Sequence, residues 1–282
     1  MKKMQAFGAG FPLEYSSCSN IKPKLFEWSK DDQDIRVFID AAIPTGINIG
    51  KNKPTDKKIA WVCESRAIFH LMYPEDMWKS NLDILSKSYD EIYVTDRRWC
   101  TENHPNIKFT FAGSNLPWVK IVDNIPQKTK LTSMVASPKK MTFGHTIRHI
   151  IAQKFNKNID LFGGANGSNR VGFGKEPWPD KSETLNPYMF QIVVENDKYE
   201  TYFTEKITDC FATGTIPIYW GSPDIGKYFN MDGIILLTPE FTIESITPEL
   251  YYKKLPAVKD NLNRVRNLET ADDILFRLIT KQ

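Results

Sequence analysis

The sequence predicts an α/β fold in which parallel strands alternate with helices. Three short runs in the first half, 35–39, 59–63 and 91–95, are rich in β-branched and aromatic residues, as buried strands usually are. A helix is expected between the last two runs, over 74–88, with Met77, Leu82 and Leu85 facing inward. Because strands that alternate with helices build parallel sheets covered on both faces, this order favours the α/β class.

The second half shows the same alternation more regularly. Strands are predicted at 131–136, 158–162, 189–195, 216–220 and 233–237, and helices at 143–155, 204–213, 224–229 and 271–280. Gly214 follows one helix where a left-handed residue is often needed. Residues 165–186, rich in Gly, Asn, Ser and Pro, are expected to form a long loop. This βαβαβ order predicts a Rossmann-like domain that binds its ligand beyond the carboxyl ends of the strands.

Length and composition define the broad class. The chain has 282 residues, 41% hydrophobic and 25% charged, which predicts an ordered protein of one large or two modest domains. We expect a boundary near 126, giving domains 1–126 and 127–282, with the last helix able to pack back on the first domain. No apolar run is long enough to span a membrane, and the first residues do not resemble a signal peptide. Four sparse cysteines favour a reducing, cytoplasmic setting, with peripheral membrane attachment left open.

Basic residues are concentrated in one segment of the chain. Between 124 and 159 there are seven lysines and arginines and no acidic residue, although the net charge of the chain is only +3. Such a local excess favours a specific anionic ligand over general binding of polyanions. A solvated basic face is the alternative interpretation.

The helix predicted at 143–155 carries the first candidate site. Phe143, Ile147, Ile150 and Ile151 share one face, which we expect to point inward, while His145, Arg148 and His149 lie on the other side. A helix N-terminus attracts phosphate oxygens, so Arg148, one turn into the helix, is well placed to bind a diphosphate. His145 and His149 have a spacing that suits zinc, but no third ligand is evident, and hydrogen-bonding histidines are favoured.

The second candidate site begins where the strand at 189–195 ends, with Glu195 and Asn196. Thr204 is a suitable cap for the following helix, and Glu205 in its first turn suits the helix dipole. Lys206 does not suit the dipole, which suggests that a bound anion compensates its charge. Tyr202 is either a ligand contact or an ordinary packed aromatic.

These two segments carry a resemblance to a known family. The run YFTEKITDCFATGTIPIYWGSP resembles the C-terminal signature of family 10 glycosyltransferases, the α1,3/α1,4-fucosyltransferases. The upstream stretch ASPKKMTFGHTIRHIIAQKF, followed by IDLFGG, is similar to the other donor-site segment of that family. The resemblance covers about 131–237. It implies a GT-B-like fold, with two Rossmann-like domains whose parallel sheets face a central cleft and with GDP-fucose held in the C-terminal domain.

The resemblance also implies roles for individual residues. Arg148 and Lys206 would contact the diphosphate, Glu205 the ribose, and Asn196 and Tyr202 the phosphate and sugar side of the donor. The predicted donor-binding set contains these five residues together with Ser137, Lys139, His145, Gly163, Glu195 and Thr204.

The reaction that the resemblance implies is an inverting transfer of fucose to a hydroxyl of an oligosaccharide or glycoconjugate, with α1,3-type linkage. A carboxylate would accept the hydroxyl proton, with no metal and no cofactor besides the donor substrate. Glu64, after the strand at 59–63, is the candidate base because WVCES resembles the corresponding site, and Asp40 is its competitor. The literal DxD at 32–34 is interpreted as an exposed turn. Aromatic candidates for the acceptor side are Trp61, His70, Tyr73, Trp99 and Trp118.

Two other hypotheses stay open at this point. One keeps the GT-B fold but uses another nucleotide sugar. The other is a non-catalytic module that binds glycans or nucleic acid through the basic segment. The basic residues fall within one predicted βα unit rather than along a stripe interleaved with aromatics, which argues against nucleic acid as a partner.

Overall fold

The computed structural model describes residues 1–8, 21–69, 78–113, 115–163 and 181–282. The chain divides into two compact units. Unit 1 comprises Met1–Leu116 and Glu269–Gln282, and unit 2 comprises Pro117–Leu268. The division thus falls ten residues before the predicted boundary, and the last helix belongs to the first unit.

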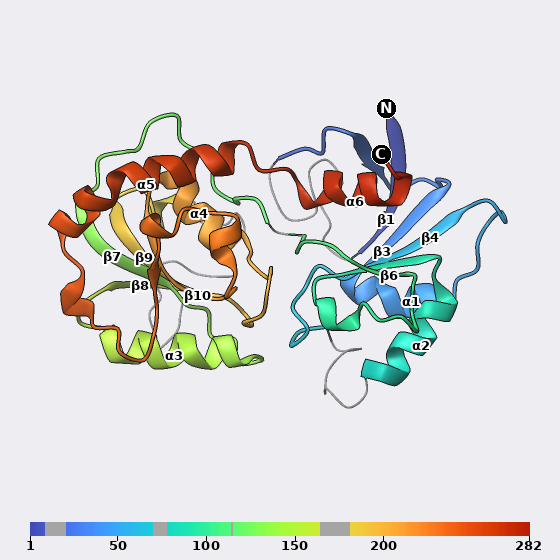
Figure 1. The fold of residues 1–282 in the computed structure, drawn as a ribbon, viewed down its shortest axis with the longest axis horizontal. Helices are drawn as coiled ribbons and strands as arrows, with labels where there is room; N and C mark the ends of the chain where they lie inside the picture. Colours follow the sequence, from blue (N-terminus) through green and yellow to red (C-terminus); the bar gives the residue numbers. More distant parts are fainter. Residues whose placement is uncertain (9–20, 70–77, 114, 164–180) are drawn as a thin grey trace. The chain divides into compact units, whose positions relative to one another are not determined.

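Unit 1 is built on a parallel sheet that has six strands within the described residues (Figure 1), in the order β2-β1-β3-β4-β5-β6. Three of them, β3 (Ile35–Ile39), β4 (Lys57–Trp61) and β5 (Glu91–Val94), are the predicted strands. The sequence analysis missed β1 (Lys2–Phe7), β2 (Phe26–Ser29) and β6 (Ile107–Phe109). Each is short, and β1 starts with exposed lysines, so the apolar signal of a buried strand is weak.

Helices cover both faces of this sheet (Figure 1). One face packs against α1 (Ile43–Ile47) and α2 (Trp78–Ser88), where Leu82 and Leu85 are buried as predicted. The other face packs against α6 (Ala271–Thr280), whose Phe276 ring stacks on Phe26. The predicted helix start at 74 and the inward position of Met77 lie outside the described residues.

Unit 2 has a second parallel sheet, five-stranded within the described residues, in the order β11-β10-β9-β7-β8. Its strands are β7 (Lys130–Val135), β8 (Asp160–Phe162), β9 (Tyr188–Val194), β10 (Ile216–Trp220) and β11 (Ile235–Leu236). The chain runs from β7 outward to β8 and then returns to β9 on the other side of β7. Because ligands bind where a doubly wound sheet reverses its order, the carboxyl ends of β7 and β9 are the expected site.

Three helices flank this sheet. Figure 1 shows α3 (Phe143–Phe155) on one face and α4 (Glu205–Thr213) and α5 (Pro248–Arg266) on the other. Gly214 ends α4 with a φ of 69°, the left-handed conformation that was predicted. Helix α5 lies where the sequence analysis assigned no element, since Pro256 interrupts its pattern. The short 3-10 turns are Asp40–Ala42, Arg97–Trp99, Lys181–Thr184, Ile225–Lys227, Met231–Gly233 and Ile243–Ser245.

The predicted inward face of α3 is partly wrong. Ile147 and Ile151 pack at the edge of the core, but Phe143 and Ile150 are 69% and 57% exposed. The residues that turn toward the sheet are instead Gly144, His145, Arg148, Ala152 and Phe155. The prediction assumed that the more apolar face is the buried one, whereas the start of α3 packs against the polar end of β9. Among the described residues, no helix is long and apolar enough to cross a bilayer.

Candidate functional site

The start of α3 is built tightly onto the carboxyl end of β9. Thr142 caps the helix by accepting the N–H of His145, whose ring nitrogen Nδ1 in turn accepts the N–H of Thr142 at 3.2 Å. A Cβ on Gly144 would lie 1.9 Å from the carbonyl oxygen of Glu195. Only glycine therefore allows this approach, which brings the start of α3 to the switch point of the sheet.

Arg148 reaches from α3 to the same strand end. Its Nε and Nη2 donate to the carbonyl oxygen of Val194 at 2.8 and 2.6 Å, and Nη2 also donates to Oδ1 of Asn196 at 2.8 Å. The side chain is buried, and in the part of the chain that the structure describes its hydrogen-bond acceptors are neutral. Burial lowers the pKa of Arg148, which the charges of Glu195 and Glu205 oppose. A guanidinium nevertheless remains charged, so this cation is suited to an anionic ligand.

His145 is neutral at this site. Burial, with the nearby charges of Arg148, Lys139 and Lys206, lowers its pKa to about 4. Because Nδ1 accepts the Thr142 N–H, the proton of the neutral ring belongs on Nε2. His145 is therefore a hydrogen-bond donor whose protonation does not change near neutral pH.

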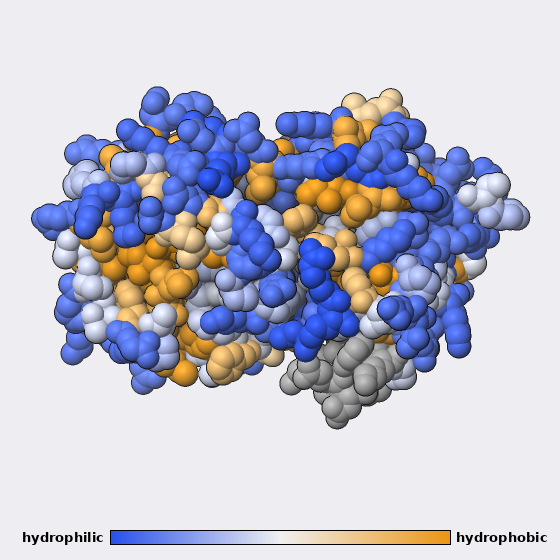
Figure 2. Space-filling view, viewed as in Figure 1, coloured by the Kyte–Doolittle hydropathy of each residue, from blue (hydrophilic) through white to orange (hydrophobic). Residues whose placement is uncertain are grey.

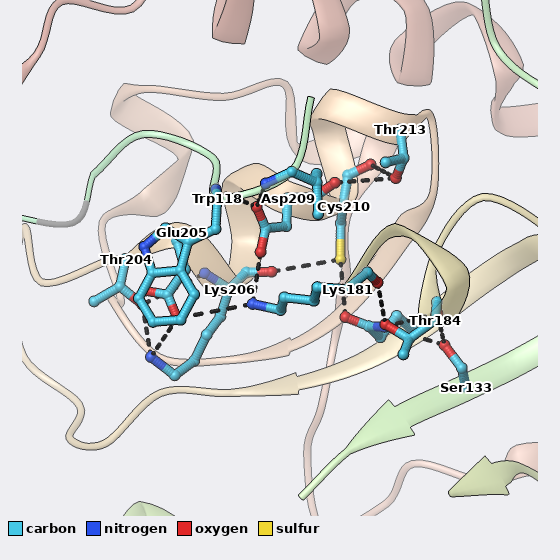
Figure 3. A network of polar contacts seen from close by, with 12 residues as sticks. Trp118, Ser133, Lys181, Thr184, Thr204, Glu205, Lys206, Asp209, Cys210 and Thr213 are labelled. Carbon is cyan, nitrogen blue, oxygen red and sulfur yellow. Dashed lines mark hydrogen bonds and ion pairs between the residues drawn. The ribbon is translucent and has the colours of Figure 1, made fainter. Parts of the chain in front are cut away.

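A second set of contacts ties the start of α4 to the end of β9. Thr204 caps α4, and both its N–H and its hydroxyl donate to the carboxylate of Glu195, at 3.0 and 2.7 Å. Lys206 Nζ lies 2.9 Å from the Thr204 hydroxyl, 3.5 Å from Glu195 and 3.3 Å from Glu205 (Figure 3 shows the Thr204, Glu205 and Lys206 side chains). Glu195 is fully buried, so it braces this corner and presents no surface to a ligand.

These contacts change the argument for Lys206. A lysine is unfavourable in the first turn of a helix, and the sequence analysis inferred that a bound anion compensates its charge. The structure supplies two carboxylates that compensate it without any ligand, Glu195 and Glu205. The case for an anion therefore depends mainly on Arg148, whose contacts are neutral.

Lys181 is a third cation in the network, and the sequence analysis missed it. Its Nζ lies 2.6 Å from Asp209 on α4 and 3.8 Å from Glu205, and it stands 5.0 Å from the centre of the Trp118 ring (Figure 3). Burial raises the pKa of Asp209 despite this partner. Asp209 also accepts the backbone N–H groups of Trp118 and Val119 at 2.7 and 3.1 Å. No local pattern links a lysine at 181 to an aspartate in α4, so only the fold reveals this network.

The loop between β9 and α4 is held by Asp224, a residue to which the sequence analysis gave no role. Asp224 accepts the N–H of Thr201 at 2.6 Å, and Thr201 has a φ of 66°. Tyr202 beside it is 1% exposed and stacks on Tyr199 with ring centres 4.7 Å apart. The ring of Tyr202 is therefore packed inside the protein, as an ordinary packed aromatic would be.

The remaining predicted donor residues lie at the same edge of the sheet. Ser137 and Lys139 follow β7, and Gly163 follows β8 with a φ of 97°. His149 contacts the backbone carbonyl of Lys139 at 3.1 Å, which matches the hydrogen-bonding interpretation of this histidine. Among the described residues, no group of His, Cys, Asp and Glu side chains is arranged to hold a metal ion. Two sets of contacts thus adjoin the end of β9. One joins Arg148 to Asn196, and the other joins Glu195, Thr204, Glu205 and Lys206.

The carboxyl edge of unit 1 carries acids. Asp40 follows β3, and its Oδ1 accepts the N–H groups of Cys63 and Glu64, directly after β4, at 2.8 and 3.2 Å. Asp40 has a φ of 41°, and burial together with the charge of Glu64 raises its pKa to about 7. Asp96 follows β5, but it is held by Arg66 and Arg98 at 3.0 and 2.9 Å. Asp40 thus has a pKa in the range where a carboxyl can exchange a proton near neutral pH, and Glu64 lies beside it.

The other sequence candidates lie elsewhere. Trp61 and Trp99 are buried in the cores of unit 1, as most tryptophans are, whereas Trp118 is 37% exposed. His70 and Tyr73 are outside the described residues. In the DxD at 32–34, Asp32 is exposed and accepts a hydrogen bond from Asn52. A cavity of about 490 Å³ between residues 123–128 and α5 contains none of the predicted donor residues.

The fold is that of an α/β protein with buried basic residues at the switch point of its second sheet. Comparisons with known proteins add to this description. Residues 125–235 match the family described as "Glycosyltransferase family 10 (fucosyltransferase) C-term". The α-(1,3)-fucosyltransferase FucT of Helicobacter pylori is 36% identical over 126 residues, which are 45% of this chain and 25% of that protein. The α-(1,3)-fucosyltransferase B of Drosophila melanogaster is 30% identical over 115 residues, which are 37% of this chain and 25% of that protein. Residues 125–235 are thus similar to the C-terminal domain of family 10 glycosyltransferases.

The matches span about a quarter of the length of these relatives. A crystal structure of an α1,3-fucosyltransferase with GDP aligns over 100% of this chain and 91% of that one, with a TM-score of 0.55 and 16% identity. A crystal structure of an α1,3-fucosyltransferase with GDP-fucose aligns over 99% of this chain and 89% of that one, with a TM-score of 0.51 and 16% identity. The likeness at this identity concerns the fold, and it confirms the GT-B-like α/β architecture with two parallel sheets.

Proposed function

We propose that this protein is an inverting glycosyltransferase that moves fucose from GDP-fucose to a hydroxyl of an acceptor glycan in α1,3-type linkage. One observation carries the donor half of the proposal. Arg148, a buried guanidinium with neutral hydrogen-bond acceptors in the described chain, lies where two helices begin at the switch point of the sheet. The family match and the GDP-fucose complex of a similarly folded protein support the nucleotide sugar.

The donor pocket would bind the diphosphate by charge and by hydrogen bonds. Arg148 supplies the charge, the Nε2–H of His145 supplies a neutral donor, and Lys206 shares its charge between Glu205 and the ligand. Glu205 would accept from the ribose hydroxyls. Glu195 and Tyr202, both buried, would position the start of α4 instead of touching the donor.

The transfer then needs one bond to form as another breaks. The acceptor oxygen attacks C1 of fucose on the side opposite GDP, and the bond from C1 to the phosphate oxygen breaks with its electron pair leaving on GDP. The charge that develops on GDP would be stabilised by Arg148 and by the positive ends of the α3 and α4 helix dipoles.

The proton of the acceptor hydroxyl would pass to a carboxylate of unit 1. We propose Glu64 as this base, because it follows the carboxyl end of β4, which ends at Trp61, and its segment resembles the corresponding site of the family. Asp40 lies against the backbone of Glu64 and remains the alternative base. The pKa of about 7 at Asp40 suits a group that accepts a proton near neutral pH.

The donor half is tested by following the melting temperature of the protein with and without GDP. GDP is expected to raise the melting temperature of the wild type, and Arg148→Ala is expected to abolish this rise. Lys128→Met is the matched control, because Lys128 is also a buried cation of unit 2 but donates to Leu185, Thr213 and Thr215, away from the carboxyl edge. Arg148→Lys, which keeps the charge but loses the two-pronged contact, should retain part of the rise.

Different outcomes would reject different parts of the proposal. A rise with UDP or ADP but not with GDP would favour a transferase for another nucleotide sugar. A GDP effect that survives in Arg148→Ala would place the nucleotide elsewhere. If the wild type responds to no nucleotide and instead binds RNA at physiological salt, the enzyme assignment fails in favour of a binding module.

A further inference from the structure

The outer side of α3 is apolar and basic at once. Met141, Phe143 and Ile150 are 63%, 69% and 57% exposed, and the ring of Phe143 stands 5.9 Å from that of Trp220. Figure 2 shows apolar side chains gathered among hydrophilic ones on the part of unit 2 where Figure 1 places α3. Around them lie four exposed lysines. We call the set the α3 outer face: Met141, Phe143 and Ile150 with Lys139, Lys140, Lys154 and Lys157.

The arrangement follows the period of the helix. Phe143, Ile150 and Lys154 recur at spacings close to whole turns, so they share one side of α3, opposite the buried Arg148 and Ala152. Lys157 is exposed and lies two residues after the helix ends at Phe155. The lysines have no acidic neighbours in sequence, since no Asp or Glu occurs between 124 and 159. Of the other basic residues in that segment, Lys128 and Arg148 are buried and Lys130 is paired with Asp160. Besides Lys130, the exposed lysines of this segment are therefore Lys139, Lys140, Lys154 and Lys157.

We propose that the α3 outer face docks on an anionic lipid surface. Phe, Ile and Met side chains enter the boundary between headgroups and acyl chains, and lysines at the same level bind anionic headgroups. Such a face lies in the plane of the membrane. The charge of the face excludes a zwitterionic surface as the preferred partner. Its exposed aliphatic side chains have no use on a nucleic acid, which is bound through phosphate contacts and base stacking.

The inference is tested with the full chain and vesicles in a flotation assay. Vesicles of equal parts phosphatidylglycerol and phosphatidylcholine are expected to carry the protein, and vesicles of phosphatidylcholine alone are not. Binding should weaken as salt is added, because the lysines act through exposed charges. Failure of the wild type to float with the anionic vesicles would reject the proposal.

Two variants separate the charged and apolar parts. Lys154→Gln with Lys157→Gln should lower vesicle binding by about tenfold or more, since each lysine near an anionic surface contributes several-fold. The matched control is Lys253→Gln with Lys259→Gln, which removes the same charge from exposed positions of α5 on the opposite face of the sheet (Figure 1). Ile150→Ser should lower binding by roughly fivefold, and Tyr252→Ser, at the exposed Tyr252 of α5, should not.

Equal losses in the α3 and α5 variants would show that only net charge matters and would overturn the proposal. So would α3 variants that lose binding to RNA but keep their binding to vesicles. The GDP-induced rise in melting temperature is a separate measurement. Lysine variants on α3 that lose vesicle binding but keep the GDP effect support the docking face, and a protein that floats without any GDP effect would reject only the donor assignment.

Discussion

The carboxyl edges of the two sheets share one topology and differ in charge. Both sheets are parallel in the described residues, and in both the polar side chains follow the strand ends. In unit 2 the edge combines Arg148, which donates to neutral oxygens, with Lys206 and Lys181, which pair with buried carboxylates. In unit 1 the edge presents Asp40 beside Glu64, with no cation among the hydrogen-bond partners of Asp40 in the described chain.

This difference in charge suits the two edges to the two halves of the proposed reaction. An edge whose cations are braced by buried carboxylates keeps its geometry and offers charge to an anion. At the other edge, burial and the neighbouring Glu64 raise the pKa of Asp40 toward neutrality, which favours proton transfer. Four substitutions would break or sharpen this comparison.

The largest effect is expected from Glu64→Gln. If the acidic edge supplies the base, transfer of fucose from GDP-fucose should fall by about 100- to 10,000-fold, because general base catalysis contributes that much. The GDP-induced rise in melting temperature should be unchanged, since the donor edge is intact. Glu102→Gln, at an exposed glutamate of the same unit, is the control for both measurements. Near-normal turnover of Glu64→Gln would move the role of base to Asp40.

A smaller but clear loss of stability is expected from Lys181→Met. The change leaves the buried carboxylate of Asp209 without the cation that lies 2.6 Å away in the wild type. The free energy of unfolding, measured by denaturant titration, should fall by about 2–3 kcal/mol. Lys130→Met removes an exposed partner of Asp160 and should cost much less. Equal costs would mean that the network around Asp209 does not brace the basic edge.

Gly144→Ala tests the close contact between α3 and the end of β9. The new methyl group would lie 1.9 Å from the Glu195 carbonyl oxygen, so the helix must shift, at a cost of about 1–3 kcal/mol. The GDP effect on melting should decrease as well, because Arg148 moves with the helix. Gly50→Ala, where a Cβ meets nothing within 4 Å, is the control. An unchanged GDP effect in Gly144→Ala would show that this contact does not position the site.

The smallest effect concerns the acidic edge and depends on pH. The pKa of Asp40 rises from 3.8 to about 7 on folding, so the folded state binds the proton more tightly and stability falls as pH increases between these values. Asp40→Asn removes the cost of ionising this buried carboxyl, and asparagine still fits the positive φ at this position. We expect Asp40→Asn to be more stable than wild type by about 1–2 kcal/mol above pH ~8.

The same advantage should shrink as pH falls toward 3.8, because the wild-type carboxyl is then protonated in the folded state and increasingly protonated in the unfolded state. Urea unfolding at several pH values measures it. An advantage that does not change with pH would contradict a raised pKa at Asp40.

The sequence by itself determined the α/β class, most strands of unit 2, the ends of α3 and α4, and the segments that match the family. These features depend on local patterns: the apolar runs of β7, β9 and β10, the cap at Thr204 and the left-handed Gly214 each leave a signal within a few residues. The donor residues around 195–206 were predicted for the same reason, as one continuous motif with a familiar spacing.

Only the tertiary structure decided which neighbours these side chains meet. The exposure of Phe143 and Ile150, the two glutamates that compensate Lys206, and the link from Lys181 to Asp209 all join segments far apart in sequence or depend on the rotation of a helix against a sheet. A helix of mixed polarity turns toward whichever neighbour satisfies its buried groups. For α3 that neighbour is the carbonyl oxygen of Val194, which no pattern within 143–155 could reveal.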